Sequence, residues 1–358
     1  MTSVLDLVRP DLRAFAGYAS ARRENATGHV WLNANESPWI SSADSGHGLN
    51  RYPEPQPAAL RARLAELYGV PVDTLMVTRG SDEGIDLLVR AFCRAGLDGV
   101  LIAPPCFGMY AVSARVQNAP LVEVPLEDDG DRFSLDLTAV EDVVAHGDVR
   151  VVFVCSPANP TGQALSMKDI RRLAKAVSGK AVLVIDEAYA EFSTIGSARD
   201  LLGEFPHLVL LRTLSKAYAM AGARIGAVIA LKDVIAVLRS LQAPYPVPAP
   251  SSSLALSSLS DAAQREARDR IATTIRERDT LLEALRGVEG VTTVYRSQGN
   301  YLLVRFADAG AAFARLLAAG VVVRDMRAMP QLGDALRISV GTPLENGALL
   351  AALRERKA

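Results

Sequence analysis

Hydrophobic residues gather in short continuous runs along the middle of the chain, separated by longer stretches with helical periodicity. The runs are rich in Val, Ile and Leu and lie at 75–78, 100–103, 151–155, 182–185, 208–211 and 227–230. The amphipathic stretches lie at 58–68, 83–94, 108–117, 137–146 and 168–177. Continuous apolar runs are typical of strands covered on both faces, and strand–helix alternation is typical of parallel sheets. The pattern predicts an α/β fold with a mostly parallel central sheet.

The pattern changes at a proline-dense stretch, APYPVPAP, where neither a helix nor a central strand can continue. Beyond it we expect a long helix over 253–286, strands at 301–306, 321–324 and 336–340, and helices at 311–319 and 344–356. This mixture predicts a smaller α+β domain. The expected parts are therefore an N-terminal arm over 1–29, a large domain over 30–245 and a small C-terminal domain over 246–358.

Composition and charge narrow the range of functions. The 358 residues include 39 Lys and Arg against 40 Asp and Glu, a balance that argues against a nucleic-acid-binding surface. No apolar run reaches the roughly 18 residues of a membrane-spanning helix. The three cysteines form no CxxC pair and the four histidines lie far apart, so we expect no disulfide framework, no metal site and a cytoplasmic location.

Polar residues follow the predicted strands at the point where open α/β sheets bind ligands. After the first run, Gly80 permits a tight turn, and Ser81 or Asp82 can cap a helix whose free N–H groups attract an anion. Taken alone, this segment is more typical of an ordinary capped turn. After 151–155, two prolines and a glycine constrain the turn around Asn159, and here a binding role is favoured.

Charged side chains follow the next two runs. Asp186 is costly to bury without a cationic partner such as a protonated ring nitrogen, although a capping or salt-bridged aspartate is common. Tyr189 can reach the same ligand. Of six lysines, Lys216 alone ends a predicted core strand, and Arg224 beyond it can bind a phosphate and lower the pKa of a nearby amine. These strand ends together offer a lysine, a carboxylate, an amide, a phenol and a phosphate site, and this set fits pyridoxal phosphate.

Ten segments in this order and spacing resemble the fold-type I pyridoxal-phosphate aminotransferases, and most closely the histidinol-phosphate aminotransferase family. They are YASARR (18–23), VWLNANESP (30–38), RYPEPQP (51–57), RGSDEGIDLLVRAFC (79–93), PPCFGMY (104–110), CSPANPTGQ (155–163), IDEAYAEF (185–192), LRTLSKAYAMAG (211–222), APYP (243–246) and LRISVGT (336–342). LNANESP and RGSDEGIDLL are the most specific to this branch. The resemblance covers nearly the whole chain and implies the fold-type I architecture.

The resemblance also implies a role for each matching residue. Lys216 would hold the cofactor as a Schiff base and then serve as general base, and Asp186 would pair with the ring nitrogen. Phe107 would stack on the ring, at a position where tyrosine is usual. The remaining contacts to the cofactor would come from its ring-oxygen and phosphate ligands, namely Asn159, Tyr189, Ser81, Asp82, Glu83, Thr213, Ser215 and Arg224.

Two further groups follow from the resemblance. Tyr52 would reach the cofactor phosphate of a neighbouring subunit, which implies a homodimer. Arg324 and Arg337 would hold the anionic group of the substrate, with Tyr18 and the loop around Asn35 closing over it.

The implied reaction is transamination of L-histidinol phosphate with 2-oxoglutarate, giving imidazole-acetol phosphate and L-glutamate in histidine biosynthesis. Phe107 in place of tyrosine keeps an aromatic amino-acid aminotransferase open, and a decarboxylase of phosphorylated amino acids shares the fold. A non-catalytic regulator that binds pyridoxal phosphate is a more distant alternative, because it would need an added basic DNA-binding module.

Overall fold

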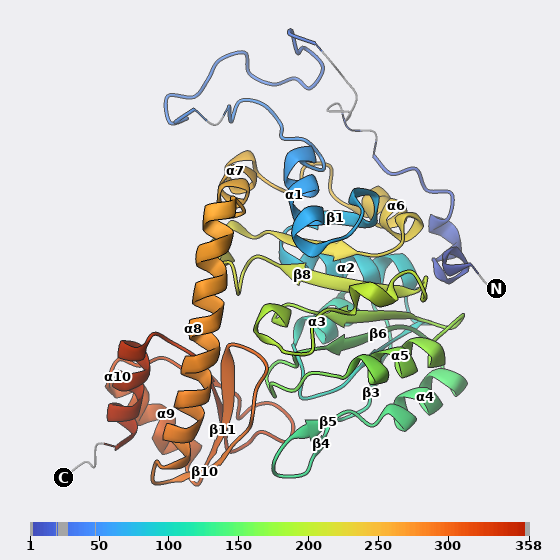
Figure 1. The fold of residues 1–358 in the computed structure, drawn as a ribbon. Coiled ribbons are helices and arrows are strands. Elements are labelled where there is room, and N and C mark those ends of the chain that lie inside the picture. Colours follow the sequence, from blue (N-terminus) through green and yellow to red (C-terminus); the bar gives the residue numbers. More distant parts are fainter. Residues whose placement is uncertain (1–2, 19, 21–27, 47, 355–358) are drawn as a thin grey trace.

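Two β-sheets organise the molecule, and the long helix α8 (Asp261–Arg286) runs beside both of them (Figure 1). The computed structural model describes residues 3–18, 20, 28–46 and 48–354. Helix α8 contacts the small sheet along its C-terminal half and also contacts a short helix that follows a strand of the large sheet. The two sheets are therefore held side by side, and the ends of their strands can contribute to one site.

The large sheet has seven strands in the order β1-β9-β8-β7-β6-β2-β3. In that order their bounds are Leu75–Thr78, Gly226–Ile229, Leu208–Thr213, Val182–Asp186, Val149–Cys155, Gly99–Ile102 and Leu121–Glu123. Strands β8, β7, β6, β2 and β3 are parallel, whereas β9 is antiparallel to both of its neighbours. The expected α/β fold with a mostly parallel central sheet is confirmed.

Helices cover both faces of this sheet (Figure 1). One face carries α2 (Gly80–Phe92), α3 (Met109–Val116) and α6 (Lys232–Leu241). The other carries α1 (Ala58–Tyr68), α4 (Leu137–His146), α5 (Met167–Ala176) and α7 (Ala249–Ser258). In β7, Val182 and Val184 pack on the first face, while Leu183 and Ile185 pack on the second. Because both faces are buried, the strands need apolar residues at every position.

The small sheet is antiparallel, in the order β10-β11-β13-β12. These strands span Val291–Val294, Tyr301–Phe306, Ala335–Ser339 and Arg324–Asp325, and the helices α9 and α10 span Ala309–Ala318 and Pro343–Arg354. The hairpin β4–β5 (Glu127–Asp128 and Phe133–Ser134) bridges the two sheets, because Arg305 of β11 forms an ion pair with Asp128 at 2.7 Å. Within the described residues there are also six 3-10 helices: η1 (Val4–Leu7), η2 (Pro10–Leu12), η3 (Val72–Thr74), η4 (Ala190–Phe192), η5 (Ala198–Leu201) and η6 (Ala221–Ala223).

The helix expected over 253–286 is in fact two helices, α7 and α8. The hydroxyl of Ser260 accepts a hydrogen bond from the backbone N–H of Ala263 and so caps the start of α8. Ala255 and Leu259 belong to the core on one face of the large sheet. Helix α7 thus packs on the large sheet, although 246–358 was expected to form the small domain, and the domain limits stay a prediction.

The strand expected over 321–324 is wrong except at its end. Only Arg324 of that range lies in a strand, because β12 is limited to Arg324–Asp325. The preceding residues leave α9 as irregular chain, where Val321 and Val323 pack against the core of the small sheet. Their apolar character reflects this packing rather than a strand.

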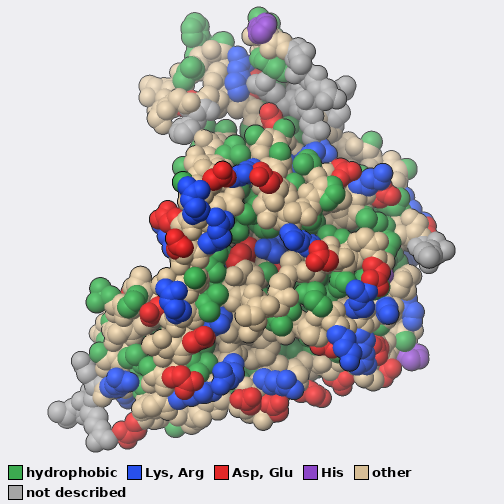
Figure 2. All heavy atoms as spheres, viewed as in Figure 1, with side chains coloured by type: hydrophobic (Ala, Val, Ile, Leu, Met, Phe, Trp, Pro, Cys, Tyr) green, Lys and Arg blue, Asp and Glu red, His purple; other side chains and the backbone are tan. Residues whose placement is uncertain are grey.

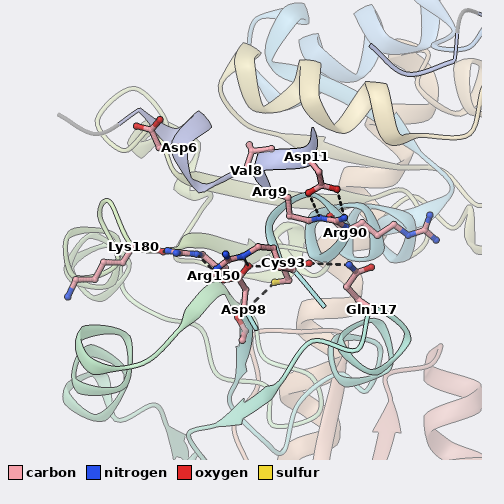
Figure 3. Close-up of polar contacts among 12 residues, drawn as sticks. Asp6, Val8, Arg9, Asp11, Arg90, Cys93, Asp98, Gln117, Arg150 and Lys180 are labelled. Carbon is pink, nitrogen blue, oxygen red and sulfur yellow. Dashed lines mark hydrogen bonds and ion pairs between the residues drawn. The ribbon is translucent and has the colours of Figure 1, made fainter. Parts of the chain in front are cut away.

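The first described residues dock on the end of α2 (Figure 3). The backbone N–H of Arg9 donates to the carbonyl of Ala91 at 3.0 Å, and its guanidinium donates to the carbonyl of Arg90 at 3.1 Å. Carbonyl groups in the last turn of a helix lack hydrogen-bond donors within that helix, and Arg9 supplies donors to two of these carbonyls. The beginning of the expected arm over 1–29 therefore lies on the large sheet, while residues 19 and 21–27 lie outside the described part.

Residues 28–46 and 48–55, here called the extended segment, have no helix or strand, and they stand away from the body until the chain returns to it at Gln56, which is buried (Figures 1 and 2). They carry large hydrophobic side chains on the surface, with Leu32 88% and Trp39 80% exposed. In the part of the chain that the structure describes, no helix is both long and apolar enough to cross a membrane.

Candidate active site

A cavity of about 650 Å³ opens at the carboxyl ends of β6, β7 and β8, facing the small sheet. It brings together most of the residues that the sequence predicts for the site. These are Ser81, Asp82, Phe107, Asn159, Asp186, Tyr189, Thr213, Ser215, Lys216, Arg224, Arg324 and Arg337. Ten of them come from the strands of the large sheet and from the turns and helix that follow those strands, and the last two come from β12 and β13 of the small sheet.

Asp186 is the buried acid of the site, only 2% exposed at the end of β7. The hydroxyl of Tyr110 donates to its Oδ2 at 2.7 Å, and the backbone N–H of Ala188 donates to its Oδ1 at 3.1 Å. Burial raises the pKa of Asp186 to about 6, although both hydrogen bonds favour the charged form. Among the described residues, Asp186 forms no ion pair, so a cationic ligand atom would fit beside it.

Lys216 follows β8 in a turn and borders the cavity. Its Nζ lies 5.7 Å from the centre of the Tyr189 ring. Burial lowers the pKa of Lys216 below its usual value, and the positive charge of Arg337 lowers it further. The negative charges of Asp82 and Asp186 oppose this shift only in part. The environment therefore shifts the amine toward its neutral form, which is the nucleophilic one.

Asn159 and Tyr189 lie next to each other between the two sheets. The amide of Asn159 donates to the hydroxyl of Tyr189 at 3.3 Å, and its carbonyl oxygen accepts a hydrogen bond from Arg337 of β13. Tyr301 of β11 donates to the backbone carbonyl of Ala158 at 2.6 Å, and its ring meets Tyr189 edge-on at 5.0 Å. The proline-rich turn that carries Asn159 is thus fixed by the small sheet.

The turn into α2 forms a cradle at the other end of the cavity. Gly80 has φ +72°, and a Cβ at this position would lie 2.4 Å from the Nη2 of Arg224. Arg224 donates to the Oγ of Ser215 at 3.4 Å and to Asp82 at 3.0 Å. A guanidinium, a hydroxyl and the first N–H groups of the 13-residue helix α2 therefore converge, which is a favourable site for a phosphate.

A pair of arginines lies on the small-sheet side. Arg324 and Arg337 are directly opposite each other in the antiparallel pair β12–β13. Like charges at opposed positions destabilise a sheet, and an anion bound between them would offset that cost. Met326 and Met329, which the sequence analysis did not single out, form an apolar wall of the cavity nearby.

These groups fit pyridoxal phosphate. A lysine shifted toward its neutral form suits an aldehyde, and a buried carboxylate without an ion pair suits a protonated ring nitrogen. The cradle around Gly80 and Arg224, which a side chain on residue 80 would fill, suits the phosphate.

Four predicted site residues do not line this cavity. The carboxylate of Glu83 instead accepts a hydrogen bond from the side chain of Gln242 at 3.0 Å, on the outer side of the turn. Tyr18 is 71% exposed, Tyr52 is 50% exposed, and Asn35 is exposed on the extended segment.

Sequence reasoning missed Tyr110. This fully buried residue of α3 also stacks on Phe153, with ring centres 4.8 Å apart, and meets Phe107 edge-on at 5.7 Å. Phe107 lies just before α3 and Tyr110 lies in the first turn of α3, three residues later, and this closely spaced aromatic pair was the available signal. No local signal marked Met326 or Met329.

Residues 18–353 match the family model for aminotransferases of class I and II. The chain is 58% identical to the histidinol-phosphate aminotransferase of Stenotrophomonas maltophilia over 99% of its own length and 98% of that protein. Its fold is similar to that of the histidinol-phosphate aminotransferase of Clostridium acetobutylicum, with a TM-score of 0.77 and 21% identity over 86% of this chain and 90% of that one. The same enzyme of Sinorhizobium meliloti, solved in complex with pyridoxal-5'-phosphate, gives a TM-score of 0.77 at 23% identity over 86% and 82% of the two chains. The chain belongs to the class I and II aminotransferases and, within them, to the histidinol-phosphate aminotransferase family.

Proposed function

We propose that the chain transfers the amino group of L-histidinol phosphate to 2-oxoglutarate, with pyridoxal phosphate as cofactor. The observation that carries this proposal is a single cavity with Lys216 and Asp186 at its centre and anion-binding groups at both ends. One end, at Arg224, suits the phosphate of the cofactor. The other, at Arg324 and Arg337, suits the phosphate or carboxylate of a substrate, and the names of the relatives select histidinol phosphate.

The cofactor supplies an aldehyde and an electron-withdrawing ring that stabilises negative charge at the substrate Cα. Lys216, in its neutral form, would take the proton from the substrate Cα and deliver it to the former aldehyde carbon of the cofactor. Asp186, held in place by the hydrogen bond from Tyr110, would stabilise the positive charge of a protonated ring nitrogen. Asn159 and Tyr189 would orient the ring through hydrogen bonds to its oxygen.

Two substrates can share the arginine pair. A guanidinium presents two parallel N–H donors that match the oxygens of a phosphate or of a carboxylate. Arg324 and Arg337 can therefore bind histidinol phosphate in one half-reaction and glutamate in the other. Phe107, as a ring-stacking residue, needs only its aromatic face, so the absence of a tyrosine hydroxyl leaves stacking intact.

We also infer a homodimer in which Tyr52 reaches the cofactor phosphate of the partner, while Tyr18 and the loop around Asn35 cover the partner's substrate. The exposed hydrophobic surface of the extended segment supports this arrangement, because such a surface is normally covered by a partner. The cytoplasmic location stays a prediction.

A direct assay tests the function. Purified holoenzyme is given histidinol phosphate or phenylalanine as amino donor, with 2-oxoglutarate as acceptor, and glutamate formation is measured. We expect kcat/KM to favour histidinol phosphate strongly. A preference for phenylalanine would replace the proposal with an aromatic amino-acid aminotransferase, and the release of CO₂ instead of glutamate would indicate a decarboxylase.

The Lys216→Ala variant tests the assignment of the central amine. It should retain the fold, lose multiple turnover and lose the absorbance of the cofactor bound covalently to the protein. Lys175→Ala, on the solvent side of α5, is the matched control and should behave as wild type. Multiple turnover by Lys216→Ala at the wild-type rate would place the reactive amine elsewhere.

A further inference from the structure

We propose that Tyr245 is a positioning residue that separately sets Tyr52 and Ser20. Its ring stacks on the ring of Tyr52, with centres 4.4 Å apart and planes 13° apart. Its hydroxyl accepts a hydrogen bond from the Oγ of Ser20 at 2.9 Å. The inference rests on the proposed function, in which Tyr52 reaches a cofactor and the neighbouring Tyr18 covers a substrate.

The segment that carries Tyr245 is anchored to the large sheet. Three residues earlier, the Nε2 of Gln242 donates to the carbonyl of Val77 and to the carboxylate of Glu83, both at 3.0 Å. Its Oε1 accepts a hydrogen bond from Gln56 at 2.7 Å. Val77 belongs to β1 and Glu83 to the first turn of α2. The segment that carries Tyr245 is therefore bound to β1 and to the first turn of α2, which also forms the phosphate cradle. Side chains that pack on Tyr245 are held in a fixed position relative to that cradle.

Hydrogen bonds join the two ends of the extended segment to each other next to Tyr245. The side chain of Glu36 is only 3% exposed, which is unusual in a segment that otherwise faces solvent. It accepts hydrogen bonds from the backbone N–H of Tyr52 at 2.6 Å and from the guanidinium of Arg51 at 2.9 Å. Arg51 also donates to the carbonyl of Trp31 at 3.3 Å. The residues around Asn35 and Tyr52 thus form one unit, and that unit rests on the ring of Tyr245.

Tyr245 consequently makes two contacts of different chemistry. The face of its ring contacts Tyr52, and this contact needs only an aromatic or flat apolar side chain. Its hydroxyl contacts Ser20, and this contact needs a hydrogen-bond acceptor. In the proposed dimer, the ring contact would govern the affinity for the cofactor phosphate, and the hydroxyl contact, two residues from Tyr18, would govern the affinity for the substrate.

Two variants separate the contacts. Tyr245→Phe keeps the ring and loses the hydroxyl, whereas Tyr245→Leu loses both. In the holoenzyme, Tyr245→Phe should raise KM for histidinol phosphate about threefold to tenfold, the effect of losing one hydrogen bond, without changing the dissociation constant of pyridoxal phosphate. Tyr245→Leu should raise both quantities. Ser20→Ala is the matched control and should reproduce the KM of Tyr245→Phe, with no further increase in the double variant.

A spectroscopic measurement is independent of turnover. The chain has two tryptophans, Trp31 and Trp39, and both lie on the extended segment. Their fluorescence anisotropy should fall in Tyr245→Leu, because the unit loses its support, and should stay at the wild-type value in Tyr245→Phe. An equal change in cofactor affinity for both variants, or wild-type anisotropy in Tyr245→Leu, would overturn the proposal. If wild-type protein does not use histidinol phosphate, the proposed function fails, while cofactor affinity and anisotropy still decide the role of Tyr245.

Discussion

Replacing Asp186 by asparagine should stabilise the cofactor-free protein while weakening its function. Burial raises the pKa of Asp186 from 3.8 to about 6, so the folded chain binds this proton more tightly than the unfolded chain does. Asparagine has the same shape and can keep both hydrogen bonds: its Oδ1 accepts from Ala188 and its Nδ2 donates to the Tyr110 oxygen. The substitution therefore removes a buried negative charge without leaving a cavity.

The magnitude follows from the shift in pKa. A rise of roughly two units corresponds to about 3 kcal/mol lost from the free energy of unfolding once the carboxylate is ionised in both states. Because the pKa is raised in the folded state, the stability that protonated Asp186 contributes is fully present below pH 4. This contribution is lost as the pH rises through 6. Relative to wild type, Asp186→Asn should gain about 3 kcal/mol at pH 8 and roughly half of that at pH 5.

Urea denaturation of both cofactor-free proteins at pH 5 and pH 8 measures this difference. With cofactor present, wild type should be more stable than Asp186→Asn, because asparagine cannot neutralise a protonated ring nitrogen. For the same reason, the kcat of Asp186→Asn should fall by orders of magnitude. Two results would refute the reasoning: no gain in stability for cofactor-free Asp186→Asn at pH 8, or a gain that is the same at pH 5.

Three other substitutions test neighbouring contacts. Tyr110→Phe removes a hydrogen bond to a charged group, worth about 1.5–3 kcal/mol, and a titration with pyridoxal phosphate should show at least tenfold weaker binding. Gly80→Ala places a Cβ 2.4 Å from Arg224 at φ +72°, so the same titration should show weaker binding of pyridoxal phosphate and of inorganic phosphate alike. Arg212→Met strands the carboxylates of Glu187 and Glu191, which now lie 2.8 and 2.6 Å from the guanidinium, and thermal denaturation should show a loss of about 3–5 kcal/mol.

The sequence predicted where several strands and helices lie and which reactive side chains follow the strands. The strand over 75–78 and the helices over 58–68 and 137–146 have the bounds that their periodicity predicts. Burial on both faces makes a strand of a parallel sheet continuously apolar, so its end is visible as the first polar residue. Asp186 and Lys216 were found for this reason, since each follows such a run.

Contacts between distant parts of the chain were not readable. Tyr110 and Asp186 are 76 residues apart, and the hydrogen bond between them exists only because the sheet order places β2 and β7 on either side of β6. Hydrophobic periodicity records whether a residue is buried, but not which residue it is buried against.

The sequence by itself therefore determined the class of fold, the cofactor chemistry and most residues of the cavity, because these depend on local patterning and on short motifs. Tertiary structure decided that Arg324 and Arg337 form a pair, that α7 packs on the large sheet, and that Tyr52 rests on Tyr245 outside its own cavity. Each of these contacts joins two residues or elements that are brought together by the order of the strands and by reversals of the chain. Hydrophobic periodicity does not encode either of them.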